Sequence, residues 1–170
     1  KKIKNLFEIS IEVLIKKEEI LKDTSILISG NKIEEIGRDL NPTAVDETIN
    51  AKGFLVIPGM VNTHHHFYQA LNRAIPEVAN AELFDWLVNL YEIWRGLDPE
   101  WVKVSTEVAV GALLLTGCTL ASDMFYVFPA KAPPDLIDYE IETAREMGIR
   151  FHPCRGSMSR GKTKNFNNYP

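Results

Sequence analysis

The chain has 170 residues, of which 45% are hydrophobic and 25% charged, as in ordinary globular proteins. Its formal net charge of −4 gives no reason to expect binding to nucleic acid or to an anionic membrane surface. No apolar run approaches the roughly 20 residues that cross a bilayer, and the basic residues at positions 1–4 precede no apolar stretch typical of a secretion signal.

Residues 1–57 are predicted to form short strands. Strands at 25–29 and 32–37 flank Gly30-Asn31, two residues that tolerate positive φ in a two-residue hairpin turn. An earlier strand is expected at 11–15, followed by a charged turn at 16–19. Such a segment buries little surface alone, so we expect it to pack on another part of the protein. No candidate for chemistry lies in it.

The segment from Val56 to Gln69 begins with apolar residues and ends near three adjacent histidines. If it is one strand, His64 and His66 point to the same side and His65 to the other. Two imidazoles placed in this way can bind a single ion, for which zinc is the first expectation. Imidazole also suits iron, nickel and copper, and Fe²⁺ is the alternative we keep. The competing interpretation is a chance run of histidines.

From Pro58 onward, predicted strands alternate with helices, which favours a parallel sheet. A helix is expected at 81–94, where apolar residues recur at three- and four-residue spacing. A second helix is expected from Asp98, a typical N-cap followed by proline, to a stop at Gly117. The remaining expected elements are strands at 118–123 and 149–154 and a helix between Pro133-Pro134 and Met147-Gly148.

The two cysteines, Cys118 and Cys154, are the only ones in the chain. The first begins one predicted strand and the second ends the next, so they are expected near opposite ends of a parallel sheet. A disulfide needs Cα atoms within about 7 Å. We therefore predict two free thiols and a cytoplasmic protein.

Four separated motifs, in order, carry a resemblance to a known family: NTHHHFYQALNRAIP, ELFDWL, GCTLASDMFYVFP and RFHPCRGSMS. Together they resemble the amidohydrolase superfamily, whose hallmark is His-x-His at the end of the first barrel strand. The resemblance is greatest to the aminohydrolase branch that contains 8-oxoguanine deaminases and hydroxydechloroatrazine ethylaminohydrolases, and it covers about residues 4–161.

The resemblance implies an α/β fold, a (β/α)₈ TIM-type barrel of the amidohydrolase type. Residues 1–57 would be the N-terminal part of a β-sandwich, and residues 58–170 the first three strand–helix units of the barrel. A complete barrel takes about 250 residues. We therefore expect an N-terminal part of a longer enzyme, inactive alone because the remaining His, Glu and Asp of the site belong to later strands. The polar tail 156–170 is expected to be a loop.

By the same resemblance, the expected activity is that of a zinc-dependent aminohydrolase acting on a purine- or triazine-like ring. Gln69 and Arg155 are candidates for contact with this small heterocyclic substrate, and bracing of a loop is the alternative for Arg155. Asp123 would orient a ligand histidine or act as a cap. His152 is expected in the core or behind the site. Hydrolysis of a cyclic amide and a non-catalytic homologue remain open, as does homo-oligomer formation.

Overall fold

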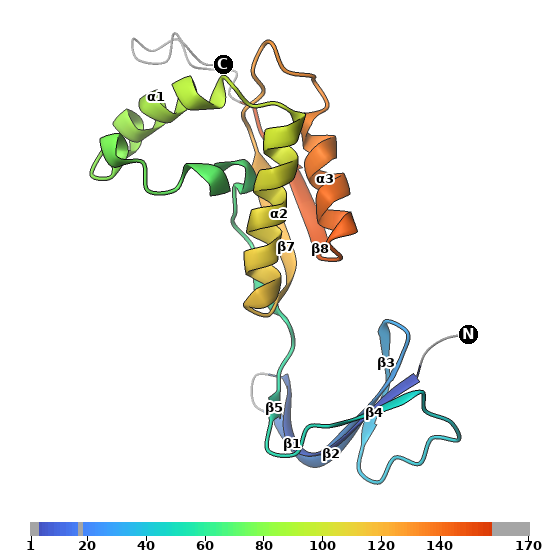
Figure 1. Ribbon diagram of the computed structural model, residues 1–170. Helices are drawn as coiled ribbons and strands as arrows, with labels where there is room; N and C mark the ends of the chain where they lie inside the picture. Colours follow the sequence, from blue (N-terminus) through green and yellow to red (C-terminus); the bar gives the residue numbers. More distant parts are fainter. Residues whose placement is uncertain (1–3, 17–18, 158–170) are drawn as a thin grey trace. The chain divides into compact units, whose positions relative to one another are not determined.

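The structure is a computed structural model that describes residues 4–16 and 19–157, with side chains from residue 20 onward. The chain divides into two compact units, Lys1–Pro58 and Gly59–Pro170, which are described separately (Figure 1). This division falls one residue from the predicted boundary. The middle of the predicted charged turn, residues 17–18, and most of the predicted tail, residues 158–170, lie outside the described residues.

The N-terminal unit is a five-stranded sheet in the order β3-β2-β1-β4, with β5 also paired to β1. The predicted hairpin is confirmed as an antiparallel pair of β2 and β3, joined by a turn at Gly30, where φ is 63°. The predicted strand at 11–15 lies inside β1. That this sheet is part of a β-sandwich stays a prediction. The strands are β1 (Lys4–Lys16), β2 (Glu19–Ser29), β3 (Lys32–Gly37), β4 (Glu47–Asn50) and β5 (Leu55–Val56).

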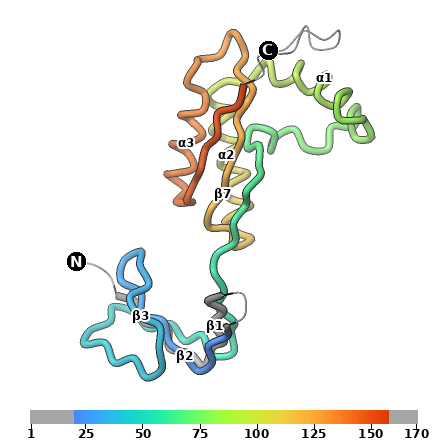
Figure 2. The backbone as a smooth tube through the Cα atoms, turned by 180° about the vertical axis from the view of Figure 1, so that it is seen from behind, coloured from blue at the N-terminus to red at the C-terminus, as the bar shows by residue number. Residues whose placement is uncertain are grey.

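The C-terminal unit contains the predicted parallel sheet, in the order β6-β7-β8. The strands are β6 (Met60–Asn62), β7 (Cys118–Phe125) and β8 (Arg150–Arg155). Strands and helices alternate along the chain, as the backbone trace in Figure 2 follows. Cys118 and Cys154 are both free thiols, as predicted.

The helices of this unit match the predicted ones to within a few residues. Asp98 caps the second helix by accepting the Trp101 backbone N–H at 2.7 Å. Gly117, with φ of 84°, ends the turn that follows it. Within the described part of the chain, no helix has the length and apolar character needed to cross a membrane. The helices are α1 (Leu83–Trp94), α2 (Pro99–Leu115) and α3 (Leu136–Glu146), with short 3₁₀ helices η1 (Phe67–Asn72) and η2 (Pro76–Val78) that were not predicted.

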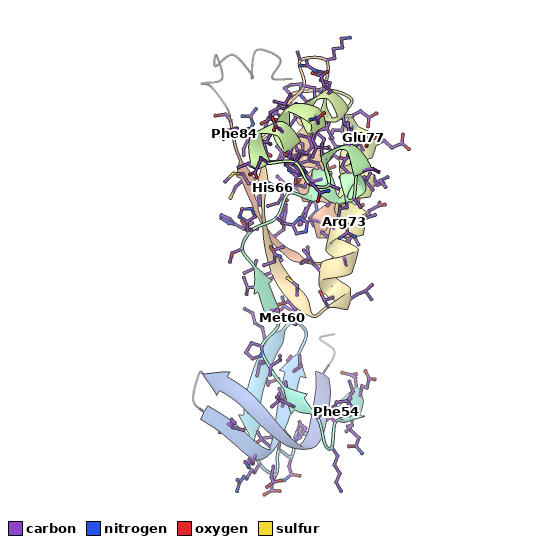
Figure 3. All side chains as sticks on the ribbon, turned by 90° about the vertical axis from the view of Figure 1, so that its left-hand side faces the viewer. Phe54, Met60, His66, Arg73, Glu77 and Phe84 are labelled. Atoms are coloured by element: carbon purple, nitrogen blue, oxygen red, sulfur yellow. The ribbon has the colours of Figure 1, made fainter. Side chains whose placement is uncertain are left out.

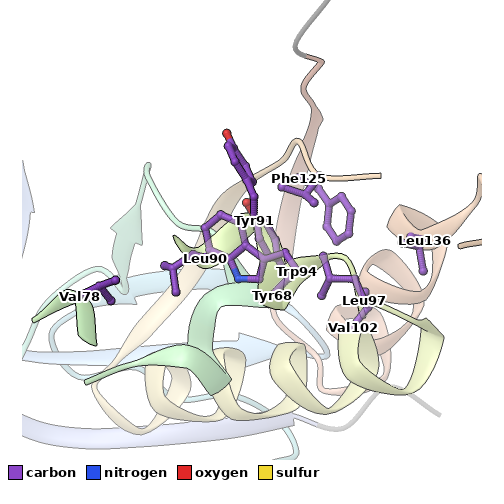
Figure 4. Packing of buried hydrophobic residues seen from close by; sticks show 10 residues of the cluster. Tyr68, Val78, Leu90, Tyr91, Trp94, Leu97, Val102, Phe125 and Leu136 are labelled. Atoms are coloured by element: carbon purple, nitrogen blue, oxygen red, sulfur yellow. The ribbon is translucent and has the colours of Figure 1, made fainter. Parts of the chain in front are cut away.

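Two hydrophobic clusters hold this unit together. In the larger one, shown in Figure 4, Trp94 of α1 lies edge-on against Tyr68 of η1, with ring centroids 5.3 Å apart. The smaller cluster joins Phe67 to α2, β7 and α3. Leu83, the first residue of α1, is 63% exposed, so the buried part of the apolar stripe begins further along the helix.

A close backbone approach fixes the start of β6. A Cβ atom on Gly59 would lie 2.2 Å from Thr119 Oγ1 of β7, so this position accepts only glycine without movement. The next residue, Met60, donates its N–H to the Gly117 carbonyl at 2.9 Å. Together these contacts set the register from which the chain runs toward the histidines.

Candidate metal centre

The three histidines follow β6 but do not belong to it, which corrects the expectation of one continuous strand. The strand ends at Asn62, and the side chain of that residue accepts the His64 backbone N–H at 3.1 Å. This is a local turn in which an asparagine side chain substitutes for a backbone acceptor. The strict two-residue alternation therefore does not decide where the histidine rings point.

The rings of His64 and His66 nevertheless lie together, as predicted. Their centroids are 5.1 Å apart and their planes are nearly perpendicular. Two imidazoles bound to one tetrahedral ion through Zn–N bonds of about 2.0–2.1 Å would have centroids about 5 Å apart. Figure 3 shows His66 beyond the end of the strand that starts with Met60. The pair thus fits a shared divalent ion, while metal binding itself stays a prediction.

The hydrogen bonding of His66 decides which ring nitrogen is available. His66 Nδ1 lies 2.8 Å from the backbone oxygen of Met124, at the end of β7. Because a carbonyl only accepts, Nδ1 carries the proton and Nε2 keeps a free lone pair. Burial lowers the pKa of His66, and the nearby His64 lowers it further against the opposing Met124 bond, so the neutral form is favoured. A ligand histidine held in this way by a carbonyl is the usual arrangement at metal sites.

His65 is held as a neutral ring between the two candidate ligands. Its Nδ1 accepts the His66 backbone N–H at 2.9 Å, and burial lowers its pKa. The distance of 4.0 Å between this nitrogen and Asp123 Oδ1 is too long for a hydrogen bond. The His65 carbonyl accepts the Met124 N–H at 3.0 Å. The histidine segment is therefore bound to the end of β7 through both the N–H and the carbonyl of Met124.

Asp123 supports this segment from the helix side of the sheet. It is buried and its Oδ1 accepts the Phe67 backbone N–H at 2.5 Å. Contrary to the predicted strand boundary, β7 continues for two residues beyond it. Asp123 therefore acts on the backbone that follows the histidines and contacts neither candidate ligand ring in the described hydrogen bonds. The reason is strand alternation, which places Ala121, Asp123 and Phe125 on the buried face.

Gln69 lies one turn further on, in η1, with its amide held by two tyrosines. Its Nε2 lies 3.3 Å from the hydroxyl of Tyr68 and 3.3 Å from that of Tyr126. The Tyr126 ring also meets the His66 ring edge-on at 5.1 Å. Burial raises the pKa of both tyrosines, so both hydroxyls stay protonated. Tyr126 was not among the predicted site residues. The signal available in the sequence was an aromatic residue just past the end of a predicted strand.

Two tryptophans hold η1 through hydrogen bonds from their indole nitrogens. Trp94 Nε1 donates to Asn72 Oδ1 at 3.0 Å, and Trp101 Nε1 donates to the Tyr68 carbonyl at 3.0 Å. A cavity of about 650 Å³ lies between η1, α1 and α2, within the size range of small-molecule sites. Its polar lining comes from the three histidines together with Gln69, Asn72, Arg73 and Thr116.

Arg155 and His152, both on β8, lie apart from this cavity lining. The Arg155 guanidinium carbon sits 4.0 Å above the centroid of the Phe128 ring, so it stacks on the loop after β7. Its assignment as a substrate contact stays a prediction beside the bracing alternative. His152 is exposed, which corrects its expected place in the core, while its alternative place behind the site stays a prediction.

Within residues 20–157, no group of three or more His, Cys, Asp or Glu side chains is arranged to hold a metal ion. The two imidazoles thus offer two ligands. A catalytic zinc site generally takes three protein ligands and leaves one position open for water or substrate.

Residues 55–169 match the model of the amidohydrolase family. The chain belongs to the amidohydrolase family. It is 41% identical over 138 residues to the 8-oxoguanine deaminase of Pseudomonas aeruginosa, covering 81% of this chain and 30% of that protein. It is 30% identical over 151 residues to hydroxydechloroatrazine ethylaminohydrolase of Pseudomonas sp. (strain ADP), covering 82% of this chain and 31% of that protein. The chain thus spans about a third of the length of these relatives.

Solved structures of this family have the same fold over nearly the whole chain. Atrazine chlorohydrolase from Arthrobacter aurescens TC1, complexed with zinc, superposes with a TM-score of 0.84 at 31% identity. The match covers 95% of this chain and 39% of the chlorohydrolase. The present chain thus has the α/β architecture that the alternation of strands and helices in its sequence predicted.

Proposed function

We propose that this chain carries the first two metal ligands of a metal-dependent aminohydrolase that releases ammonia or an amine from a purine- or triazine-like ring. The observation that carries the proposal is the pairing of the His64 and His66 rings. His66 Nδ1 is hydrogen-bonded to the Met124 carbonyl, so Nε2 keeps a free lone pair for a metal ion. Membership of the amidohydrolase family supports it.

His64 and His66 are the residues that would hold the ion, for which zinc is the first choice and Fe²⁺ the alternative. When bound, such an ion supplies Lewis-acid activation of a water molecule near neutral pH. The protein's own contribution is to keep His66 neutral and both imidazoles aimed together. The Asn62 turn fixes the backbone before them, and the Asp123–Phe67 bond fixes it afterwards.

Gln69 is the proposed substrate contact on this part of the chain. A carboxamide offers both a donor and an acceptor, which matches the amide edge of an oxidised purine or a hydroxylated triazine. Its position is set by the hydroxyls of Tyr68 and Tyr126 before any ligand arrives, which lowers the entropy lost on binding. The substrates after which the two relatives are named, 8-oxoguanine and hydroxydechloroatrazine, are the first compounds to test.

The fold context of the proposal is a barrel. Strands β6, β7 and β8 would be the first three of eight, with the histidines at the carboxyl end of the first strand, where the active sites of such barrels lie. The N-terminal sheet would belong to a β-sandwich. The further ligands and the proton-transferring group would come from residues outside this chain, and the product of the complete reading frame would act in the cytoplasm.

The test is zinc content and ammonia release with 8-oxoguanine for the product of the complete reading frame. We expect near-stoichiometric zinc and turnover in the wild type. Both should be lost in His64→Ala and in His66→Ala, because each variant removes one ligand. Glu142→Gln is the control, since this side chain is exposed on α3 and does not line the cavity.

Three outcomes would contradict the proposal. A protein without zinc that is folded and inactive would be a non-catalytic homologue. A zinc protein that opens cyclic amides without releasing ammonia would be a cyclic amide hydrolase. Equal loss of zinc in the Glu142→Gln control would show that the effect is not specific to the histidine pair.

A further inference from the structure

A pair of carboxyl groups is buried between the sheet and helix α3. Asp123 of β7 is 1% exposed and Glu140 of α3 is 0% exposed, and the two carboxyl groups lie within hydrogen-bonding reach of each other. Glu140 lies on the buried face of the helix with Leu136, Thr143 and Ala144. A glutamate in this position is uncommon, because acidic side chains are almost never fully buried unless they are paired.

The two carboxyl groups cannot both be ionised. Among the described residues, neither oxygen of Glu140 nor Asp123 Oδ2 meets an N–H or O–H donor. A hydrogen bond between two carboxyl groups requires one of them to hold a proton. Burial raises the pKa of Glu140 to about 10, and the neighbouring Asp123 raises it in the same direction. The proton therefore resides on Glu140 at neutral pH, and Asp123 accepts the hydrogen bond from this O–H.

The other oxygen of Asp123 connects this pair to the histidines. Asp123 Oδ1 accepts the N–H of Phe67, the residue directly after His66. The side chain of Asp123 thus has two partners, Glu140 on α3 and the backbone of the histidine segment. A carboxylate without its second partner would be free to rotate or would take up a proton itself, and either change would weaken its hold on Phe67.

We propose that Glu140 is a positioning residue for the metal site: its carboxyl O–H donates a hydrogen bond to Asp123 and so fixes the Phe67 backbone that sets the convergence of His64 and His66. The inference rests on the proposed function for its metal. It concerns a residue on α3 that contacts neither histidine. Replacement of such supporting partners at metal sites typically lowers metal affinity by about 10- to 100-fold.

The test compares four proteins made from the complete reading frame: wild type, Glu140→Gln, Glu140→Leu and the control Glu142→Gln, whose side chain is exposed on the same helix. Zinc affinity is measured by competition with a chromophoric chelator. Amide hydrogen exchange of Phe67 is measured in the metal-free proteins. Glu140→Leu should weaken zinc binding about 10- to 100-fold and speed exchange at Phe67.

Rescue by the conservative variant distinguishes positioning from mere packing. Glutamine can donate an N–H to Asp123 in place of the carboxyl O–H, so Glu140→Gln should bind zinc within about twofold of wild type and keep Phe67 protected. Asp123→Asn should also keep Phe67 protected, because its Oδ1 still accepts while its amide N–H meets Glu140. Glu140→Gln and Asp123→Asn test the positioning role of Glu140 even where Glu140→Leu does not fold.

The proposal is overturned by a tenfold loss of zinc affinity in Glu140→Gln, or by wild-type affinity and wild-type exchange in a folded Glu140→Leu. A wild-type protein that binds no zinc would refute the proposed function instead. In that case the exchange of Phe67 in the metal-free variants still decides whether Glu140 holds the histidine segment through Asp123.

Discussion

Replacing Glu140 with glutamine should change how the stability of the protein depends on pH. The folded protein holds a proton on this side chain at neutral pH, because burial raises its pKa from 4.5 to about 10. The unfolded chain releases that proton above about pH 4.5. A group whose pKa is raised on folding contributes stability that is complete below the unfolded value and is lost as the pH rises toward the folded value.

The magnitude follows from the separation between the pH and the unfolded pKa. Each pH unit above about 4.5 costs the folded wild type about 1.4 kcal/mol, so the cost near pH 7 is about 3 kcal/mol. Because Glu140 is fully buried, screening by solvent does not reduce this free-energy cost. Burial also raises the pKa of Asp123, to about 7, but this second contribution is present in the wild type and in Glu140→Gln alike.

The assay is urea unfolding of wild type and Glu140→Gln between pH 5 and pH 8. The difference in unfolding free energy should move in favour of the glutamine variant by about 1.4 kcal/mol per pH unit. The second N–H of the amide lacks a partner and adds a cost of about 1–3 kcal/mol that does not depend on pH, so the slope carries the test. A difference between Glu140→Gln and wild type that is constant with pH would refute the shared proton.

Two further substitutions test the packing that positions the site. Trp94→Ala should lower the unfolding free energy by about 3–5 kcal/mol, because it empties a fully buried position. Leu83 is exposed on the same helix, so Leu83→Ala should change the unfolding free energy by about 0.5 kcal/mol or less. Similar losses for the two variants in denaturant unfolding would contradict the described core. Gly59→Ala should cost about 1–3 kcal/mol through overlap with Thr119. Adding Thr119→Ala should restore only part of this, since the Thr119 Cβ itself lies 2.7 Å from the new methyl group, and full recovery of the melting temperature would refute the close approach.

Features that depend on neighbouring residues were predictable from the sequence. The start of α2 follows from Asp98 and Pro99, which supply a cap and a fixed φ within one turn of the helix. The hairpin of β2 and β3 follows from the conformational freedom at Gly30. The proximity of His64 and His66 also follows from their separation by one residue, although the expected strand stops before them.

The roles of the residues around the histidines were decided by the tertiary structure. The proton on His66 Nδ1 depends on the carbonyl of Met124, 58 residues away in the chain, and the Phe67 N–H depends on Asp123, 56 residues away. In sequence, Glu140 is one of several acids on an amphipathic helix, and only the packing of α3 on the sheet removes it from water. Local sequence thus determined the elements and the candidate ligands. Burial and long-range pairing, which no local pattern encodes, determined their protonation and orientation.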